Sequence, residues 1–224
     1  MKHGLRVLLG LVFAAVVMTA GSAFAQTYPS LVVGTAGVVW ECNGACTDAS
    51  AIPPSNPVAM STFTPGAINY NSNAASNGYT IGGFLDTAGG GAGGTLSGTA
   101  LYGDNADNTL WQITGKVFIG DGTNTWAITH DDGAQFFIPG LQAAALFSQP
   151  GPTSAETTTF SYVNNVNSAD GFYTFVLNYN ECCGPPAVLQ LSQLSAPGPT
   201  PGAGLPSFVV LVLAGALAWT RKFA

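Results

Sequence analysis

Two adjacent carboxylates, Asp131 and Asp132, are the residues of this sequence that are best placed to do chemistry, and Gly133 follows them. Runs of alternating apolar residues flank the three, and Asp-Gly between such runs is a strong signal for a hairpin turn. One interpretation is that Asp and Gly serve turn geometry alone. The other is that the two carboxylates repel each other at the turn until a Ca²⁺, which prefers hard oxygen ligands, binds between them.

Catalytic chemistry has little support in the sequence. His130 is the only histidine between residues 26 and 195, and no serine or cysteine motif offers it a nucleophile. Asp131 and Glu181 could form the carboxylate pair of a glycosidase, but nothing in the sequence determines their separation. We therefore predict no catalytic residue and expect that the protein is not an enzyme.

The first 25 residues predict a cleavable signal peptide. Lys2 and Arg6 precede an apolar run at 7–17, and Ala23-Phe24-Ala25 fits the small-x-small rule of signal peptidase. The apolar run is too short to span a bilayer comfortably as an uncleaved anchor. We expect cleavage between Ala25 and Gln26, so that the protein is exported.

The C-terminal end predicts a membrane segment. A Pro/Gly-rich linker at 196–204 precedes a hydrophobic helix at 205–224 that ends in basic residues. Its apolar part would be about 22 Å long, against about 30 Å for the hydrocarbon core. Because basic residues stay in the cytoplasm, this helix would leave residues 26–195 outside, at the bacterial cell envelope, surface or extracellular matrix.

The order of linker, short apolar helix and basic tip resembles the PEP-CTERM sorting tails that exosortases process. Gly198 stands between Pro197 and Pro199, where that family has a glutamate. The resemblance implies an exosortase-type processing enzyme as a partner and at least transient membrane anchoring. A plain C-terminal anchor is the alternative.

The segment between residues 26 and 195 is strongly acidic. It holds all eleven Asp and Glu residues of the chain and one basic residue, Lys116, which gives a formal charge of −10. Neutralising phosphates requires Lys and Arg, so this balance argues against nucleic acid as a partner. A divalent cation is the natural counter-charge, although acidic surfaces also serve solubility.

The four cysteines of the chain predict disulfides, because an exported protein lies in an oxidising environment. We expect Cys42 and Cys46 to lie close to Cys182 and Cys183 and to tie the start of the domain to its end. Bonds from Cys42 to Cys46 and from Cys182 to Cys183 are the rival pairing. Zinc is less favoured, since no histidine lies near either pair.

The pattern of residues 26–195 predicts an all-β fold. Short strand-like runs alternate with turns rich in glycine, asparagine and proline, and no long stretch has a helical period. We expect one antiparallel β-sandwich, similar to a jelly roll, between the signal helix and the C-terminal hydrophobic helix. The expected strands are 31–40, 110–119, 125–130, 135–138, 157–163, 172–179 and 187–194.

A resemblance to a known family rests on motifs in a particular order. Gly-Lys-Val-Phe-Ile at 115–119 precedes Trp-x-Ile-x-x-Asp-Asp-Gly at 126–133, and the tyrosine-rich 171–181 and Ala-Val-Leu-Gln-Leu at 187–191 follow. This order is similar to that of the lectin-like β-sandwich family named after the anthrax protective antigen. The resemblance covers roughly residues 110–194.

The resemblance implies a Ca²⁺ site and a sugar site. In sugar-binding members the paired aspartates, joined by a cis peptide, hold a Ca²⁺ with an asparagine from a loop near the last strands. Asp131, Asp132 and Asn180 match these ligands by position, and we place Glu181 with them among the ligand-binding residues. The sequence 182–186 departs from the family in the loop that would border the sugar.

Two hypotheses for function follow from these observations. The first is a lectin-like module that binds a glycan or exopolysaccharide, with Ca²⁺ as its cofactor. The second is a structural matrix or surface protein without a small-molecule ligand, whose acidic surface only keeps it in solution.

Overall fold

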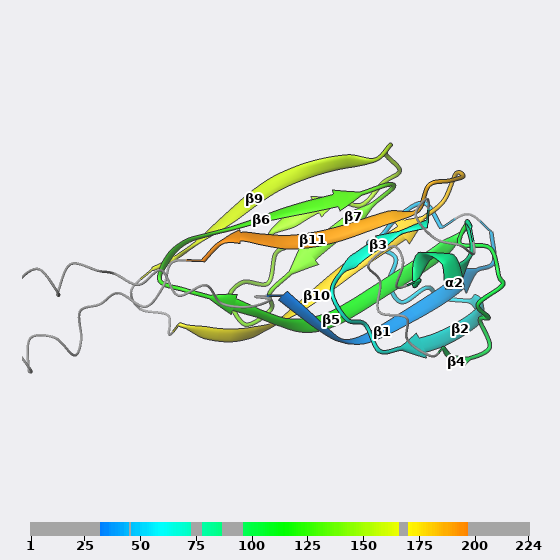
Figure 1. Ribbon diagram of the computed structural model, residues 1–224, viewed down its shortest axis with the longest axis horizontal. Coiled ribbons are helices and arrows are strands. Elements are labelled where there is room, and N and C mark those ends of the chain that lie inside the picture. The colour runs from blue at the N-terminus through cyan, green and yellow to red at the C-terminus, as the bar shows by residue number, and fades with distance from the viewer. Residues whose placement is uncertain (1–31, 45, 73–77, 87–95, 166–169, 197–224) are drawn as a thin grey trace, which may run out of the picture. The chain divides into compact units, whose positions relative to one another are not determined.

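In the computed structural model the chain forms two antiparallel β-sheets (Figure 1). The described residues are 32–44, 46–72, 78–86, 96–165 and 170–196. One sheet has seven strands in the order β4-β2-β1-β5-β10-β7-β8, and the other has four in the order β3-β11-β6-β9. The elements are β1 (Val32–Cys42), β2 (Pro57–Phe63), β3 (Asn69–Asn71), α2 (Ile81–Phe84), β4 (Ser97–Gly98), β5 (Thr109–Ile119), β6 (Gly122–His130), β7 (Ala134–Phe137), β8 (Phe147–Gln149), β9 (Glu156–Asn164), β10 (Gly171–Glu181) and β11 (Val188–Ser195).

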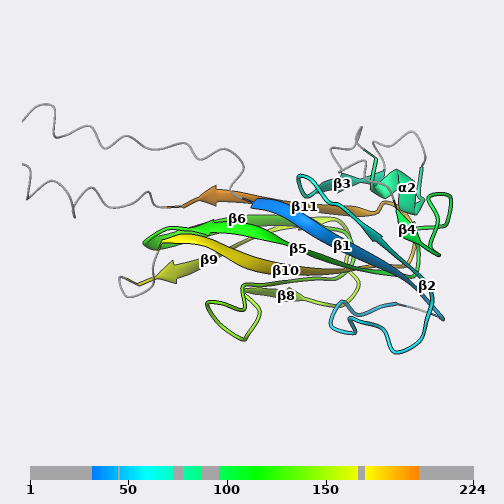
Figure 2. The ribbon, with the colours of Figure 1, turned by 90° about the horizontal axis from the view of Figure 1, so that it is seen from below.

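The predicted all-β sandwich is confirmed, and each of the seven expected runs forms a strand. Four further strands, β2, β3, β4 and β8, were not predicted. The last three have only two or three residues, and β2 exposes most of its residues and lacks a regular alternation of apolar and polar types. The short helix α2 was also not predicted. It begins after Thr80, whose hydroxyl accepts a hydrogen bond from the Gly83 amide at 2.9 Å, and it lies beside β3 (Figure 2).

The core lies between the two sheets and follows from strand alternation. Trp126 and Ile128 of β6 are fully buried, as are Phe175 and Leu177 of β10, whereas alternate residues of each strand are more exposed. Phe136 of β7 joins the sheets, because its ring centroid lies 6.1 Å from that of Trp126 and 5.5 Å from that of Phe175. Every second residue of these strands therefore contributes to the apolar surface that is buried between the two sheets and stabilises the sandwich.

Two chain crossings between the sheets meet at one end of the sandwich. The turn 131–133 leads from β6 in the four-stranded sheet to β7 in the seven-stranded sheet. The segment 182–187 leads from β10 back to β11 in the opposite sense. Tyr179 pairs with Ala134 in one sheet and Leu189 pairs with His130 in the other, so both crossings lie at the same end.

The predicted terminal segments lie outside the described residues. The signal peptide at 1–25, with its cleavage site at Ala25 and Gln26, and the C-terminal helix at 205–224 both fall there, as does the linker at 196–204 apart from Ala196. Within the described ranges, no helix has the length and apolar character needed to cross a membrane.

Trp111 is the core residue whose loss should destabilise the fold most clearly. Its side chain is fully buried, donates a hydrogen bond from Nε1 to the Thr109 hydroxyl at 2.7 Å and contacts the rings of Phe63 and Phe84. We expect Trp111→Ala to lower the free energy of unfolding by about 3–5 kcal/mol in urea denaturation. The exposed Leu194→Ala should change it by about 0.5 kcal/mol or less, and equal effects of both variants would contradict this assignment of the core.

Candidate functional site

The backbone of the Asp131-Asp132-Gly133 turn is held by hydrogen bonds from three other segments. The Asp131 amide donates to the Val188 carbonyl and the Asp132 amide to the Thr153 carbonyl, each at 2.9 Å. The Gly133 carbonyl accepts from the Asn180 amide, also at 2.9 Å. The turn thus has a defined position between β11, the 152–155 segment and the end of β10.

Asp132 has a backbone conformation that few residue types adopt, with a φ of 68°. Aspartate tolerates this left-handed region better than most residues with a Cβ. Gly133 follows because a side chain would not fit there: a Cβ at this position would collide with the Pro150 carbonyl and with Oδ1 of Asn180. The turn therefore requires Gly133 and suits Asp132, so its geometry alone accounts for both residue types.

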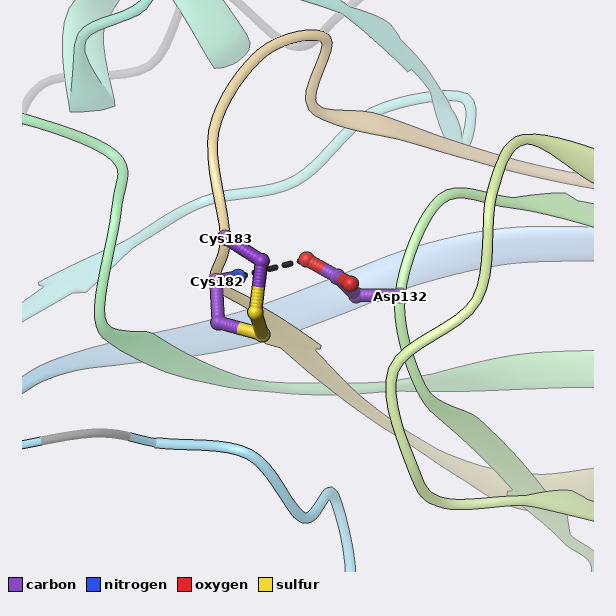
Figure 3. A group of neighbouring side chains, drawn as sticks. All are labelled: Asp132, Cys182 and Cys183. Atoms are coloured by element: carbon purple, nitrogen blue, oxygen red, sulfur yellow. Dashed lines mark hydrogen bonds between the residues drawn. A yellow bond between two sulfur atoms is a disulfide. The ribbon is translucent and has the colours of Figure 1, made fainter.

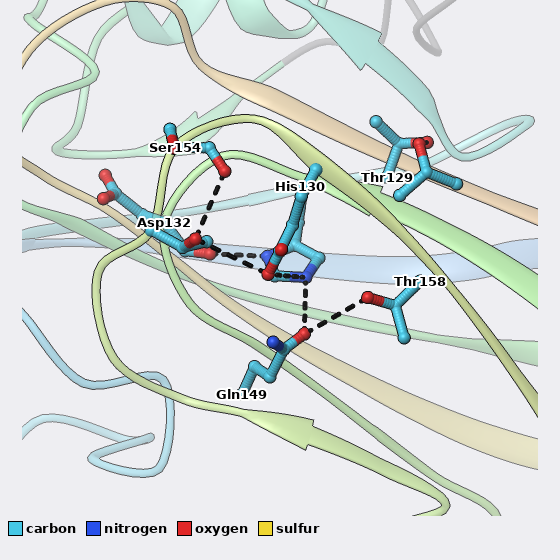
Figure 4. Close-up of polar contacts among 9 residues, drawn as sticks. Thr129, His130, Asp132, Gln149, Ser154 and Thr158 are labelled. Carbon is cyan, nitrogen blue, oxygen red and sulfur yellow. Dashed lines mark hydrogen bonds and ion pairs between the residues drawn. The ribbon is translucent and has the colours of Figure 1, made fainter.

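His130 supports the turn from inside the sandwich (Figure 4). Its ring is fully buried, and Nδ1 lies 2.6 Å from the Asp132 carbonyl oxygen, to which it donates. Nε2 lies 3.2 Å from Oε1 of Gln149, which also contacts the Thr158 hydroxyl at 3.4 Å. This histidine is a positioning residue for the Asp pair.

The Asp132 carboxylate points toward the segment that follows β10. Its Oδ2 accepts a hydrogen bond from the Cys182 amide at 2.6 Å (Figure 3). Burial raises the pKa of Asp132 to about 6, and the neighbouring charge of Asp131 adds to the rise, against the lowering effect of the Cys182 amide. Burial also raises the pKa of Asp131. A nearby cation would counter both effects by favouring the ionised forms.

A pocket of about 610 Å³ opens beside the two aspartates. Its walls are Asp131 and Asp132, the segment 152–155 and the segment 182–186. No lysine, arginine or aromatic side chain is among these lining residues. The pocket is therefore an acidic depression with room for a small polar ligand.

Glu181 lies behind the pocket wall and is fully buried. The Tyr79 hydroxyl donates to its Oε1 at 2.6 Å, and the Tyr179 hydroxyl is hydrogen-bonded to its Oε2. Burial, together with the charges of Asp132 and Asp131, raises the pKa of Glu181 to about 9, so its carboxyl is neutral at pH 7. Glu181 does not line the pocket, whereas the sequence predicts it among the ligand-binding residues.

Asn180 is also buried behind the pocket. Its Nδ2 donates to the Cys46 carbonyl at 3.2 Å, which attaches Cys46 to the end of β10. Its Oδ1 lies against Gly133, is buried and has no hydrogen-bond donor. The structure therefore brings Asn180 to the Asp-Asp-Gly turn, with an amide oxygen that lacks a partner.

Three expectations about this region are wrong. Asp131-Asp132-Gly133 does not close a hairpin, because β6 and β7 belong to different sheets. The resemblance implied a cis bond between Asp131 and Asp132, but among the described residues the cis bonds are Ile52–Pro53 and Pro185–Pro186. The cross-pairing of the cysteine clusters is also wrong: Cys42 bonds to Cys46, and Cys182 bonds to Cys183.

The sheet order explains why Cys42 does not reach the second cluster. It ends β1, whereas Cys182 directly follows β10, and β5 lies between these two strands. Strands separated by one other strand are about 10 Å apart, and a disulfide joins Cα atoms within about 7 Å.

Comparisons with solved structures support one fold. The PA14 domain of the antifreeze protein MpAFP superposes with a TM-score of 0.52 and 23% identity, covering 81% of this chain and 100% of that domain. The PA14 sugar-binding domain from an RTX adhesin superposes with a TM-score of 0.50 and 20% identity, covering 72% of this chain and 90% of that domain. This chain has the PA14 fold. Neither a protein-family model nor a curated protein matches its sequence.

Several residues of the site were not predicted. Tyr79, which binds Glu181, lies about 100 positions before it, and the 152–155 wall belongs to a turn without a recognisable ligand motif. The Gly-Pro-Thr-Ser sequence at 151–154 indicates a turn, but it does not indicate that this turn lines a pocket.

The raised pKa of Glu181 gives a measurable pH dependence. Between its ordinary pKa of 4.5 and about 9, the folded protein keeps a proton that the unfolded chain releases, so stability falls as the pH rises. We expect Glu181→Gln, which is neutral at every pH, to make the free energy of unfolding less dependent on pH in urea titrations from about pH 5 to pH 9. Asp170→Asn, at an exposed position, should keep the wild-type dependence of the free energy of unfolding on pH. The same dependence in Glu181→Gln would refute the assignment of a raised pKa to Glu181.

Proposed function

We propose that this protein is an exported surface or extracellular-matrix protein whose PA14-type domain binds a glycan or exopolysaccharide beside Asp131 and Asp132. The observation that carries the proposal is the pocket of about 610 Å³ that both aspartates line. A sugar-binding adhesin domain among the structural neighbours, together with a disulfide-containing, acidic body, supports the same class of function. The role is one of binding rather than catalysis.

Ca²⁺ is the cofactor that we propose for this pocket. The predicted ligands Asp131, Asp132 and Asn180 offer hard oxygen atoms, which is the donor type that Ca²⁺ prefers. Two of them are carboxylates whose burial opposes ionisation, and the third has a buried amide oxygen without a donor. The donor set therefore fits Ca²⁺, which would supply charge neutralisation and open coordination positions for sugar hydroxyls.

Export, sorting and anchoring complete this proposal. The signal peptide would direct the chain out of the cytoplasm, and the C-terminal tail would bring it to an exosortase-type enzyme or hold it in the membrane. Both ends lie outside the described residues, so these roles rest on the sequence.

A structural matrix protein without a small ligand is the second candidate. The outward residues of β9 favour it, because Thr157, Thr159, Ser161 and Val163 are exposed and uncharged on a strand at the edge of its sheet. An unpaired edge strand without charge is prone to pair with other chains. This candidate predicts no glycan binding and no response to chelators.

A thermal shift experiment tests the Ca²⁺ site. If Ca²⁺ is present at about 100 times its Kd, binding adds about 2.7 kcal/mol of stability, which corresponds to a rise in Tm of roughly 5–10 °C for a domain of this size. Asp132→Asn removes a charge while its side-chain oxygen can still accept from Cys182, and we expect it to abolish the rise. Asp170→Asn removes the same charge from an exposed loop and should retain the rise. Wild-type protein that is unaffected by millimolar Ca²⁺ would count decisively against the site.

A further inference from the structure

The two sides of the Asp131–Asp132 pocket differ in chemistry. One side carries the two carboxylates and the hydroxyl side chains of Thr153 and Ser154. The other side is the run Cys182-Cys183-Gly184-Pro185-Pro186, in which no side chain has an N–H or O–H group once the cysteines are bonded. The pocket therefore joins a polar wall to an apolar wall.

The disulfide between Cys182 and Cys183 lies where the two walls meet (Figure 3). Both sulfur atoms lie within 4.8 Å of a carboxylate oxygen of Asp132, and that carboxylate accepts the hydrogen bond from the Cys182 amide. Cys182 is buried, whereas Cys183 is exposed. The disulfide thus presents an outer face to the pocket and is attached to the sandwich from behind.

The disulfide also restricts the backbone of this wall. A bond between neighbouring cysteines closes a ring of eight atoms, which includes the peptide bond between them. Cys183 has a φ of 69° and Gly184 a φ of 105°, so two successive residues lie outside the region that most residues occupy. Two prolines follow, each with a fixed φ. The apolar wall is therefore rigid.

We propose that the Cys182–Cys183 disulfide and the adjoining prolines form the surface on which the apolar C–H face of a pyranose ring rests, and that binding requires this disulfide to be oxidised. This inference rests on the proposed glycan-binding function and specifies how the ring is held. Sugar sites need an apolar surface beside their hydrogen-bonding groups, and aromatic rings usually provide it. No aromatic side chain lines this pocket, and the polarisable sulfur atoms provide the surface in its place.

The geometry assigns an orientation to the ligand. The ring hydroxyls point toward Asp131 and Asp132, where a bound Ca²⁺ and the hydroxyls of Thr153 and Ser154 can meet them. The C–H face lies against the sulfur atoms and Pro185 and Pro186. The ligand class is thus a pyranose that has hydroxyls on one edge and a continuous C–H patch on an adjacent face.

Reduction opens this wall. A dithiol reductant transfers two electrons and two protons to the disulfide, the S–S bond breaks, two S–H groups form, and the dithiol becomes a cyclic disulfide. The eight-membered ring no longer exists, so Cys183 is free to leave its left-handed conformation. Two polar thiols on a mobile segment then replace the rigid apolar face.

The test measures binding to an array of pyranose-terminated glycans in Ca²⁺, before and after treatment with dithiothreitol and blocking of the thiols. We expect reduction to weaken binding by roughly 2- to 10-fold, which corresponds to about 0.4–1.4 kcal/mol and is similar in size to a sulfur–aromatic contact. Cys182→Ser/Cys183→Ser should bind as weakly as the reduced wild type and should not respond further to dithiothreitol. This variant keeps the Cys42–Cys46 disulfide, so it also controls for reduction there.

The outcomes separate the two proposals. Glycan binding that reduction and Cys182→Ser/Cys183→Ser both leave unchanged overturns this inference alone. Oxidised wild type that binds no glycan overturns the proposed function and this inference together. The thermal shift with Ca²⁺ should persist in Cys182→Ser/Cys183→Ser, because the carboxylates remain, and its persistence distinguishes a lost sugar surface from an unfolded protein.

Discussion

Three carboxyl groups are buried at one end of this sandwich without a lysine or arginine beside them in the described part of the chain, and the rest of the site follows from that constraint. Each group is accommodated differently. Glu181 keeps its proton and is hydrogen-bonded to two tyrosines, while Asp132 accepts the Cys182 amide. The Asp131–Asp132 pair retains the unbalanced charge and faces a pocket. Ca²⁺ would supply the balancing charge that the protein itself does not provide.

The fold creates this constraint through its topology. The crossings that follow β6 and β10 lie at the same end, so the turn after β6 and the segment after β10 are neighbours although about 50 residues separate them. Asn180 and His130 lie beneath the turn. Asn180 contacts the Cys46 carbonyl, and His130 contacts Gln149. Four distant segments therefore determine where two adjacent side chains point.

The sequence predicted the parts of the structure that depend on local pattern. Alternation along β6 and β10 identified their buried faces. Asp-Gly identified a turn, but the turn crosses from one sheet to the other and does not form the predicted hairpin, because β6 and β7 pair with other strands. The disulfide pairing could not be derived, because it depends on strand order, which places β5 between Cys42 and Cys182. The partners of Glu181 and the wall at 152–155 are likewise tertiary, and polar turns carry no signal for what they will face.

The segment 182–186 makes no pairing in either sheet, because it lies between the end of β10 and the start of β11. Apart from Cys182, which is buried, its side chains can therefore be exchanged without repacking the core or shifting any strand register. Divergence among proteins of this architecture can concentrate at the four positions after Cys182, while the acidic turn opposite stays the same.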